Sequence, residues 1–199
     1  SQGFSPATTG LLVSVFYGTT LLARPLAGSC IEGLGTRVTL LLAGGGTLLG
    51  GAGLLVLSSA PGIFCCRVVA GLGFSLGTVA LAAYQGLAIP PELRGRSFAL
   101  TAIGSITTMI VVVPLGEGLM RSGWPLGYLA LPPLLALATL ALGSSLPPLK
   151  TAQLPPAWGT WGELLRNREY LWILGSAFCF SLADASVLFL SPLVSGAGL

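Results

Sequence analysis

Charged side chains are scarce in this chain, and histidine is absent. Only 8% of the 199 residues are charged, nine of them Lys or Arg and six of them Asp or Glu. A soluble domain carries about 25% charged residues, so these few charges cannot cover a globule of this size in water. Without histidine, the chain cannot build histidine-ligated metal sites or catalytic triads that use an imidazole. Its four cysteines include no C-x-x-C pair and are expected to be small packing residues.

Hydrophobic residues make up 53% of the chain, alongside 29 glycines and 14 prolines. Transmembrane helices carry more Gly and Pro than the helices of soluble proteins. We therefore predict an all-α membrane protein, a polytopic helical bundle. The net charge of +3 comes from basic residues in the connections and forms no stripe, so nucleic acid is not an expected partner. We also expect no cofactor.

Six apolar runs are long enough to cross a membrane, which takes about 20 residues. They cover residues 7–27, 38–58, 63–89, 98–120, 125–146 and 171–194. The tetrapeptide Ser59-Ala60-Pro61-Gly62 predicts a turn before the third run. Gly46-x-x-x-Gly50 and Gly73-x-x-x-Gly77 are small-residue faces that allow close approach of two helices.

The basic residues predict the orientation of these spans. On one side the connections hold Arg24, Arg37, Arg94, Arg96, Lys150, Arg166 and Arg168, whereas Arg121 is the basic residue of the other side. By the positive-inside rule, the connections 24–37, 90–96 and 147–168 face the cytoplasm. Ser1 then lies outside, which leads us to expect a longer protein with at least one preceding span.

Few charges fall within the predicted spans, where an ionised side chain is costly, and Asp184 and Arg67 are the candidates for a functional role. Asp184 lies roughly 20 Å into the sixth span, too deep for its short side chain to reach either surface. Exclusion of water favours the neutral carboxylic acid form of Asp184. This form suits a carrier of protons, and it equally suits a carboxylic acid that is hydrogen-bonded between two helices. Arg67 lies near the outer start of the third span, where a long side chain could also extend to the interface.

The segment 24–37, RPLAGSCIEGLGTR, resembles a motif of a known transporter family. It is similar in spacing to the loop between helices two and three of the major facilitator superfamily, with Arg-Pro before it as in efflux-type members. The matching residues are Arg24, Pro25, Gly28, Gly35 and Arg37. Glu32 stands where the family usually has aspartate.

Three further segments extend the resemblance in the same order along the chain. Arg67, Gly71 and Gly73 match the fourth-helix motif R-x-x-x-G-x-G, whose arginine is associated with proton coupling in the family. Residues 90–96, PPELRGR, resemble the loop between helices four and five. Residues 113–118, VPLGEG, resemble a degenerate fifth-helix motif of antiporters.

The resemblance implies that the six spans correspond to helices two to seven of twelve. Residues 1–146 would then form most of the N-terminal bundle, 147–167 the cytoplasmic central linker, and 168–199 the first helix of the C-terminal bundle. It also implies roles for particular residues. Arg67 and Asp184 would couple transport to protons, and Tyr84, Gln85 and Pro114 would line the cavity. We call the remaining set the latch residues, which would control a cytoplasmic conformational latch: Arg24, Gly28, Glu32, Gly35, Arg37, Arg94 and Gly95.

The function implied by the resemblance is secondary transport of a small organic solute by alternating access, as proton-coupled efflux from a cell inner (plasma) membrane. The expected partners are membrane lipid, the solute, protons and the remaining helices of the full-length transporter. A sugar or metabolite uptake symporter is the alternative within the class. A membrane-embedded enzyme would need a metal cluster, nucleophile–base pair or phosphate cradle, which we do not find in the sequence. A non-transporting scaffold would have no reason to retain buried charge.

Overall fold

A computed structural model describes residues 5–149 together with 166, 168, 171 and 175–176, except for the side chains of 6, 9, 108–109, 113, 117, 120 and 125. The chain divides into two compact units, Ser1–Pro155 and Pro156–Leu199. The division falls within the predicted linker 147–167, and the domain assignment itself stays a prediction. Most of the predicted sixth span, including Asp184, lies outside the described residues.

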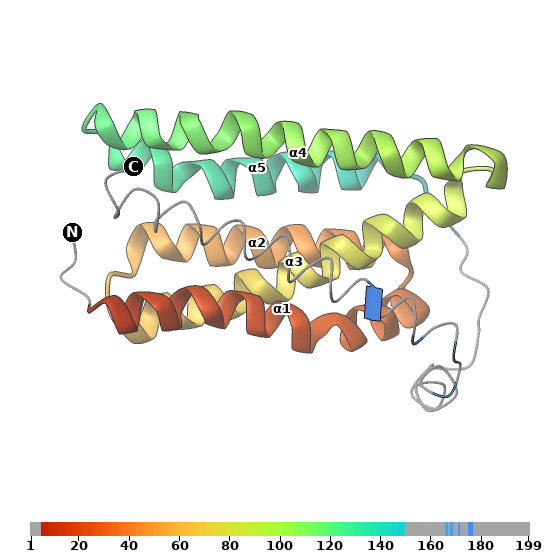
Figure 1. The fold of residues 1–199 in the computed structure, drawn as a ribbon, viewed down its shortest axis with the longest axis horizontal. Helices are drawn as coiled ribbons and strands as arrows, with labels where there is room; N and C mark the ends of the chain where they lie inside the picture. The colour runs from red at the N-terminus through yellow and green to blue at the C-terminus, as the bar shows by residue number, and fades with distance from the viewer. Residues whose placement is uncertain (1–4, 150–165, 167, 169–170, 172–174, 177–199) are drawn as a thin grey trace. The chain divides into compact units, whose positions relative to one another are not determined.

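Five long helices form the described part of the first unit: α1 (Pro6–Leu34), α2 (Thr36–Val56), α3 (Ala60–Ala88), α4 (Pro91–Arg121) and α5 (Pro125–Ser145). They alternate in direction along the long axis, so that consecutive helices are antiparallel (Figure 1). Each contains an apolar stretch long enough to cross a membrane. The first five predicted spans are therefore confirmed as helices, although some of their ends differ.

Local signals in the sequence explain two of the helix starts. The Ser59 hydroxyl accepts a hydrogen bond from the Gly62 backbone N–H, at 3.3 Å, and caps α3 where the turn was predicted. Ser5 caps α1 in the same way by accepting from the Thr8 N–H at 3.2 Å. Both caps satisfy a backbone donor that has no partner within its own helix.

The predicted hairpin at 24–37 is wrong in its extent. Helix α1 continues through Arg24 and Pro25 to Leu34, and Gly35 alone separates it from α2. Pro25 removes one backbone donor, but the surrounding turns keep their hydrogen bonds and hold the helix together. Reversal of the chain needs a residue outside the helical region of backbone conformation, and Gly35 supplies it with φ +85°.

The predicted loop 90–96 is also mostly helical, because α4 begins at Pro91 and not near Phe98. Proline is well suited to the first turn of a helix, where its missing N–H would have had no partner. Glu92 in the same turn interacts favourably with the positive end of the helix dipole. The polar residues of both segments thus extend helices past the apolar runs.

Small residues bring α2 and α3 into close contact. A methyl group added at Gly46 would lie 3.1 Å from the Gly73 Cα, and one added at Gly77 would lie 3.3 Å from the Ala43 Cβ. The two predicted small-residue faces therefore meet each other, as such faces do in membrane bundles. Helix α3 also packs on α1, and α2 on α5, whereas α4 contacts only α3 and α5 among the described helices.

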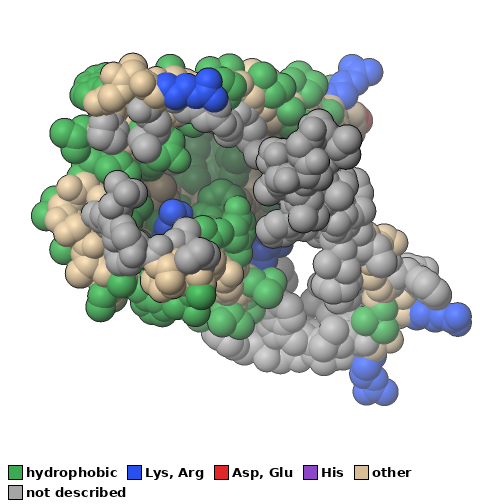
Figure 2. All heavy atoms as spheres, turned by 60° about the vertical axis from the view of Figure 1, so that its left-hand side comes forward, with side chains coloured by type: hydrophobic (Ala, Val, Ile, Leu, Met, Phe, Trp, Pro, Cys, Tyr) green, Lys and Arg blue, Asp and Glu red, His purple; other side chains and the backbone are tan. Residues whose placement is uncertain are grey.

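Burial in the described helices is reversed relative to a soluble protein. The fully buried side chains are small or polar, such as Thr39, Ser75 and Ala80. Large apolar side chains lie outside, including Leu22 at 78% exposure and Val56 at 82%. Hydrophobic side chains accordingly cover much of the described surface in Figure 2. Such a surface is stable in lipid, and the chain is a multi-pass membrane protein.

Candidate functional site

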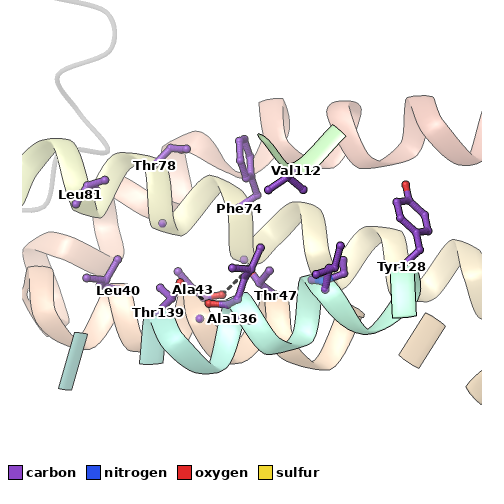
Figure 3. Close-up of a pocket in the computed structure, with 16 residues that line it drawn as sticks. Leu40, Ala43, Thr47, Phe74, Thr78, Leu81, Val112, Tyr128, Ala136 and Thr139 are labelled. Carbon is purple, nitrogen blue, oxygen red and sulfur yellow. Dashed lines mark hydrogen bonds between the residues drawn. The ribbon is translucent and has the colours of Figure 1, made fainter. Parts of the chain in front are cut away.

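A cavity of about 560 Å³ lies between α2, α3, α4 and α5 (Figure 3). Small residues open it from the α2 and α3 sides, among them Ala43, Gly44 and Gly73. Leu40 and Leu135 add apolar side chains from α2 and α5. The volume lies within the range of about 300–1,000 Å³ that is usual for small-molecule sites.

Four hydroxyl groups, from Thr47, Thr78, Thr139 and Tyr128, are the polar side-chain groups in the lining. The three threonine hydroxyls donate to backbone carbonyls of their own helices: Thr47 to Ala43 at 2.9 Å, Thr78 to Ser75 at 3.1 Å, and Thr139 to Leu135 at 3.0 Å. The protons of the three threonine hydroxyls are therefore committed, and these three groups can offer a ligand only acceptor lone pairs. Such a cavity accommodates apolar groups, from a solute or from a neighbouring helix, better than a charged ligand.

Tyr84, Gln85 and Pro114, which were predicted to line a cavity, are not among the residues that line this one. Tyr84 donates its hydroxyl proton to the Pro147 carbonyl at 3.2 Å, and the Gln85 amide donates to the Thr101 hydroxyl. Pro114 lies exposed within α4. The sequence held a weak signal for the lining that we missed, since Gly44 and Thr47 are three residues apart and share one face of α2.

Arg67 lies in the second turn of α3, partly buried. Its Nε is shielded from solvent and has no hydrogen-bond partner within the described ranges. A guanidinium nitrogen out of water needs an acceptor, so this position invites a carboxylate or carbonyl oxygen. Asp184, the other predicted coupling residue, lies outside the described residues.

Gly35, Arg37, Arg94 and Gly95 lie at or near the end of the unit where α1 meets α2 and α3 meets α4 (Figure 1), whereas Arg24 lies ten residues before the end of α1. Arg37 donates a guanidinium hydrogen bond to the Ser144 carbonyl at 2.5 Å and so ties α2 to the end of α5. Arg94 donates from Nε to the Ile89 carbonyl at 3.1 Å and closes the turn between α3 and α4.

The other latch residues lie on α1 and near the start of α4. Arg24 is exposed and Gly28 half-buried on α1, and Gly95 is exposed on α4. Glu32, half-buried one turn before Gly35, is engaged in an interaction of its own. The structure thus gives Arg37 and Arg94 specific backbone partners at this end of the bundle.

The family model of the Major Facilitator Superfamily matches residues 1–199. The chain belongs to the major facilitator superfamily. Uncharacterised MFS-type transporters of Pseudomonas aeruginosa strains LESB58 and UCBPP-PA14 are each 31% identical to it over 123 residues, which is 62% of this chain and 24% of theirs.

A solved structure, the inward-open conformation of the xylose transporter XylE from E. coli, has a similar fold. Its TM-score is 0.62 at 19% sequence identity, with 88% of this chain and 46% of that chain covered. The chain thus spans about half the length of this structural relative, and its matched segment spans about a quarter of the curated ones. The predicted family and fold class, a partial helical bundle of the superfamily, are both confirmed.

Proposed function

We propose that the full-length protein is a secondary transporter that moves a small organic solute across a cell inner (plasma) membrane by alternating access, as proton-coupled efflux. The observation that carries the proposal is the match of the family model to the whole chain. Membership of this family favours transport over an enzymatic role or a passive scaffold. Transporters of this family are built from inverted repeats, and their halves rock about a central site.

The packing of the described helices suits a bundle that moves as one body. Contact through Gly46, Gly73 and Gly77 leaves little room for α2 and α3 to slide past each other. Motion in such a protein is then concentrated at the ends of the helices. Arg37 and Arg94 make their hydrogen bonds at these ends, where breaking and forming a few such bonds can favour one conformation over another.

Proton coupling is assigned to Arg67 and Asp184. The Nε of Arg67 is buried without an acceptor within the part of the chain that the structure describes. A carboxylate that approaches it during the transport cycle would be stabilised in its charged form, and one that withdraws would take up a proton. Alternation between these two states is how a carboxyl group could couple proton movement to solute movement.

The experiment uses the full-length protein in proteoliposomes with an imposed pH gradient. We expect the gradient to drive solute movement in the wild type, and Asp184→Asn to abolish the coupling while the protein remains folded. The matched control is Glu92→Gln, which removes an exposed carboxylate at the start of α4. Coupled transport at the wild-type rate in Asp184→Asn would remove Asp184 from the mechanism.

A sugar or metabolite uptake symporter is the second candidate. The fold is similar to that of a xylose transporter, and at 19% identity this likeness concerns the fold alone. The direction of solute flux separates the two candidates. An exporter moves solute against the proton flow, whereas a symporter accumulates solute on the side to which protons move.

A further inference from the structure

The cavity between α2, α3, α4 and α5, which we call the long cavity, extends along the helices. Its lining runs from Tyr128 at one end to Leu40, Leu81 and Thr139 towards the other (Figure 3). Thr139 follows Tyr128 by eleven residues on α5, which corresponds to about 16 Å of helix. Because α5 begins at Pro125, the Tyr128 end lies close to the turn between α4 and α5.

The chemistry of the long cavity suits an apolar chain. The described lining holds no charged side chain, and its three threonine hydroxyls already donate to carbonyls of their own helices. A charged or strongly polar ligand would lose its hydration there without replacement. Apolar cavities of this kind exclude water and bind apolar molecules instead.

The long cavity is partly open to the surroundings of the bundle. Phe74, Tyr128 and Leu135 belong to its lining and are still 47%, 45% and 50% exposed. Large apolar side chains cover the surface of the described helices, so these surroundings are the hydrocarbon of a membrane. Lipid acyl chains are the most concentrated apolar groups in that medium, and mass action favours their entry over that of a dilute solute.

The size of the long cavity fits one such chain. An apolar cavity of about 150 Å³ holds the six carbon atoms of benzene, so one of about 560 Å³ has room for roughly twenty. The hydrocarbon core of a membrane is about 30 Å thick, and each leaflet therefore contributes about 15 Å. This depth matches the distance of about 16 Å along α5 from Tyr128 to Thr139.

We propose that the long cavity holds one acyl chain of a membrane lipid, with the polar end of the lipid at Tyr128 and the end of the chain near Leu40 and Leu81. The headgroup then lies at the membrane surface where α4 turns into α5. Trp124 in that turn is 60% exposed, and tryptophan is enriched at this level of a membrane. The site does not depend on the proposed transport function, since a lipid can occupy it whether or not a solute moves.

The test uses the full-length protein in phosphatidylcholine vesicles that contain one of two photoreactive probes. Both probes are phosphatidylcholines with a diazirine in one acyl chain, either near the end of the chain or next to the ester. After illumination, mass spectrometry of the digested protein locates the label. Leu40 and Ala136 line the cavity but are only 9% and 3% exposed, so a lipid on the outer surface of the bundle does not reach them. We expect the chain-end probe to label both, and the ester probe to label residues around Tyr128.

Four variants locate the effect. Thr78→Phe and Thr139→Phe each add an aromatic ring to the lining at an exposed position, from α3 and from α5, and should lower labelling of Leu40 and Ala136 roughly tenfold. Thr107→Phe makes the same exchange at an exposed position of α4 outside the lining and should label as the wild type does. Thr78→Val removes a hydroxyl at nearly constant shape and should also label normally, because an acyl chain needs no hydrogen bond.

Several results would overturn the proposal. Absence of label on Leu40 and Ala136 in the wild type would do so, as expected if further helices of the protein fill the cavity. Wild-type labelling in a folded Thr78→Phe or Thr139→Phe protein would exclude the cavity as the binding site, and either variant decides this if the other fails to fold. An equal loss in Thr107→Phe would indicate contact at the outer surface. A loss in Thr78→Val would indicate recognition of a polar group, and exchanged labelling patterns of the two probes would contradict the direction of the chain.

Discussion

Gly50 of α2 is the position where the packing of the bundle predicts the sharpest effect of a single methyl group. A Cβ at this residue would lie 2.7 Å from the Ala70 Cβ, 2.8 Å from the Ala70 backbone nitrogen and 2.8 Å from the Cys66 carbonyl oxygen. Ordinary van der Waals contact begins at 3.4 Å. Two of the three atoms belong to the backbone of α3, so the clash cannot be relieved by rotating a side chain. Gly50→Ala must therefore push α2 and α3 apart.

The expected cost follows from overpacking, which typically destabilises a core by about 1–3 kcal/mol. The matched control is Gly45→Ala on the same helix, since a Cβ there meets no atom within 4 Å. Both variants gain the same helix propensity, about 0.5–1 kcal/mol for Ala over Gly, so this contribution cancels in the comparison. Gly50→Ala should thus be about 1–3 kcal/mol less stable than Gly45→Ala, a factor of roughly 5–150 in the unfolding equilibrium constant.

The assay is SDS-induced unfolding of the purified full-length protein in mixed micelles, followed by intrinsic tryptophan fluorescence. Equal unfolding midpoints for Gly50→Ala and Gly45→Ala would refute the close approach of α2 and α3. A second change sharpens the test. Adding Ala70→Gly to Gly50→Ala removes one of the three close atoms and leaves the two backbone atoms, so it should restore only part of the lost stability.

Two further predictions concern the corner of the bundle. Gly35→Ala places a Cβ on a residue with φ +85° and should cost about 1–3 kcal/mol, measured by the same SDS titration, whereas Gly33→Ala, within α1 and with open space around it, should not destabilise. Equal midpoints for the two would contradict the sharp turn. Tyr84→Phe removes the hydrogen bond to the Pro147 carbonyl and should cost about 0.5–1.5 kcal/mol and speed proteolysis just after α5, with the exposed Tyr17→Phe as its control. Unchanged cleavage in Tyr84→Phe would show that this bond does not hold the segment.

The solvent and the family of this protein could be predicted from the sequence. The scarcity of charge and the long apolar runs require lipid around the helices, whatever their arrangement. The small-residue faces of α2 and α3 were also visible, because residues three and four apart share one side of a helix. The motifs around Arg24, Arg67 and Arg94 indicated the superfamily because they are local patterns with fixed spacing.

The ends of the helices were harder to predict. The polar segments 24–37 and 90–96 were interpreted as loops. Hydropathy detects where a helix leaves the apolar medium and not where its hydrogen bonds stop. Helix α1 instead continues through Pro25 until the positive φ of Gly35 ends it. That a proline would be accommodated within a helix depends on the turns and helices around it, and hydropathy does not report them.

The two cavities were determined by tertiary structure alone. The larger one unites Leu40 of α2 with Thr139 of α5, which lie far apart in the sequence, and its shape depends on the contacts between four helices. A smaller cavity, at the corner between α1 and α2, likewise needs the segment after α5 to lie beside Thr36 and Arg37. Local sequence determines whether a segment is helical, because that depends on neighbouring residues. Which side chains face a common space depends on contacts between distant segments, and these form only when the helices pack.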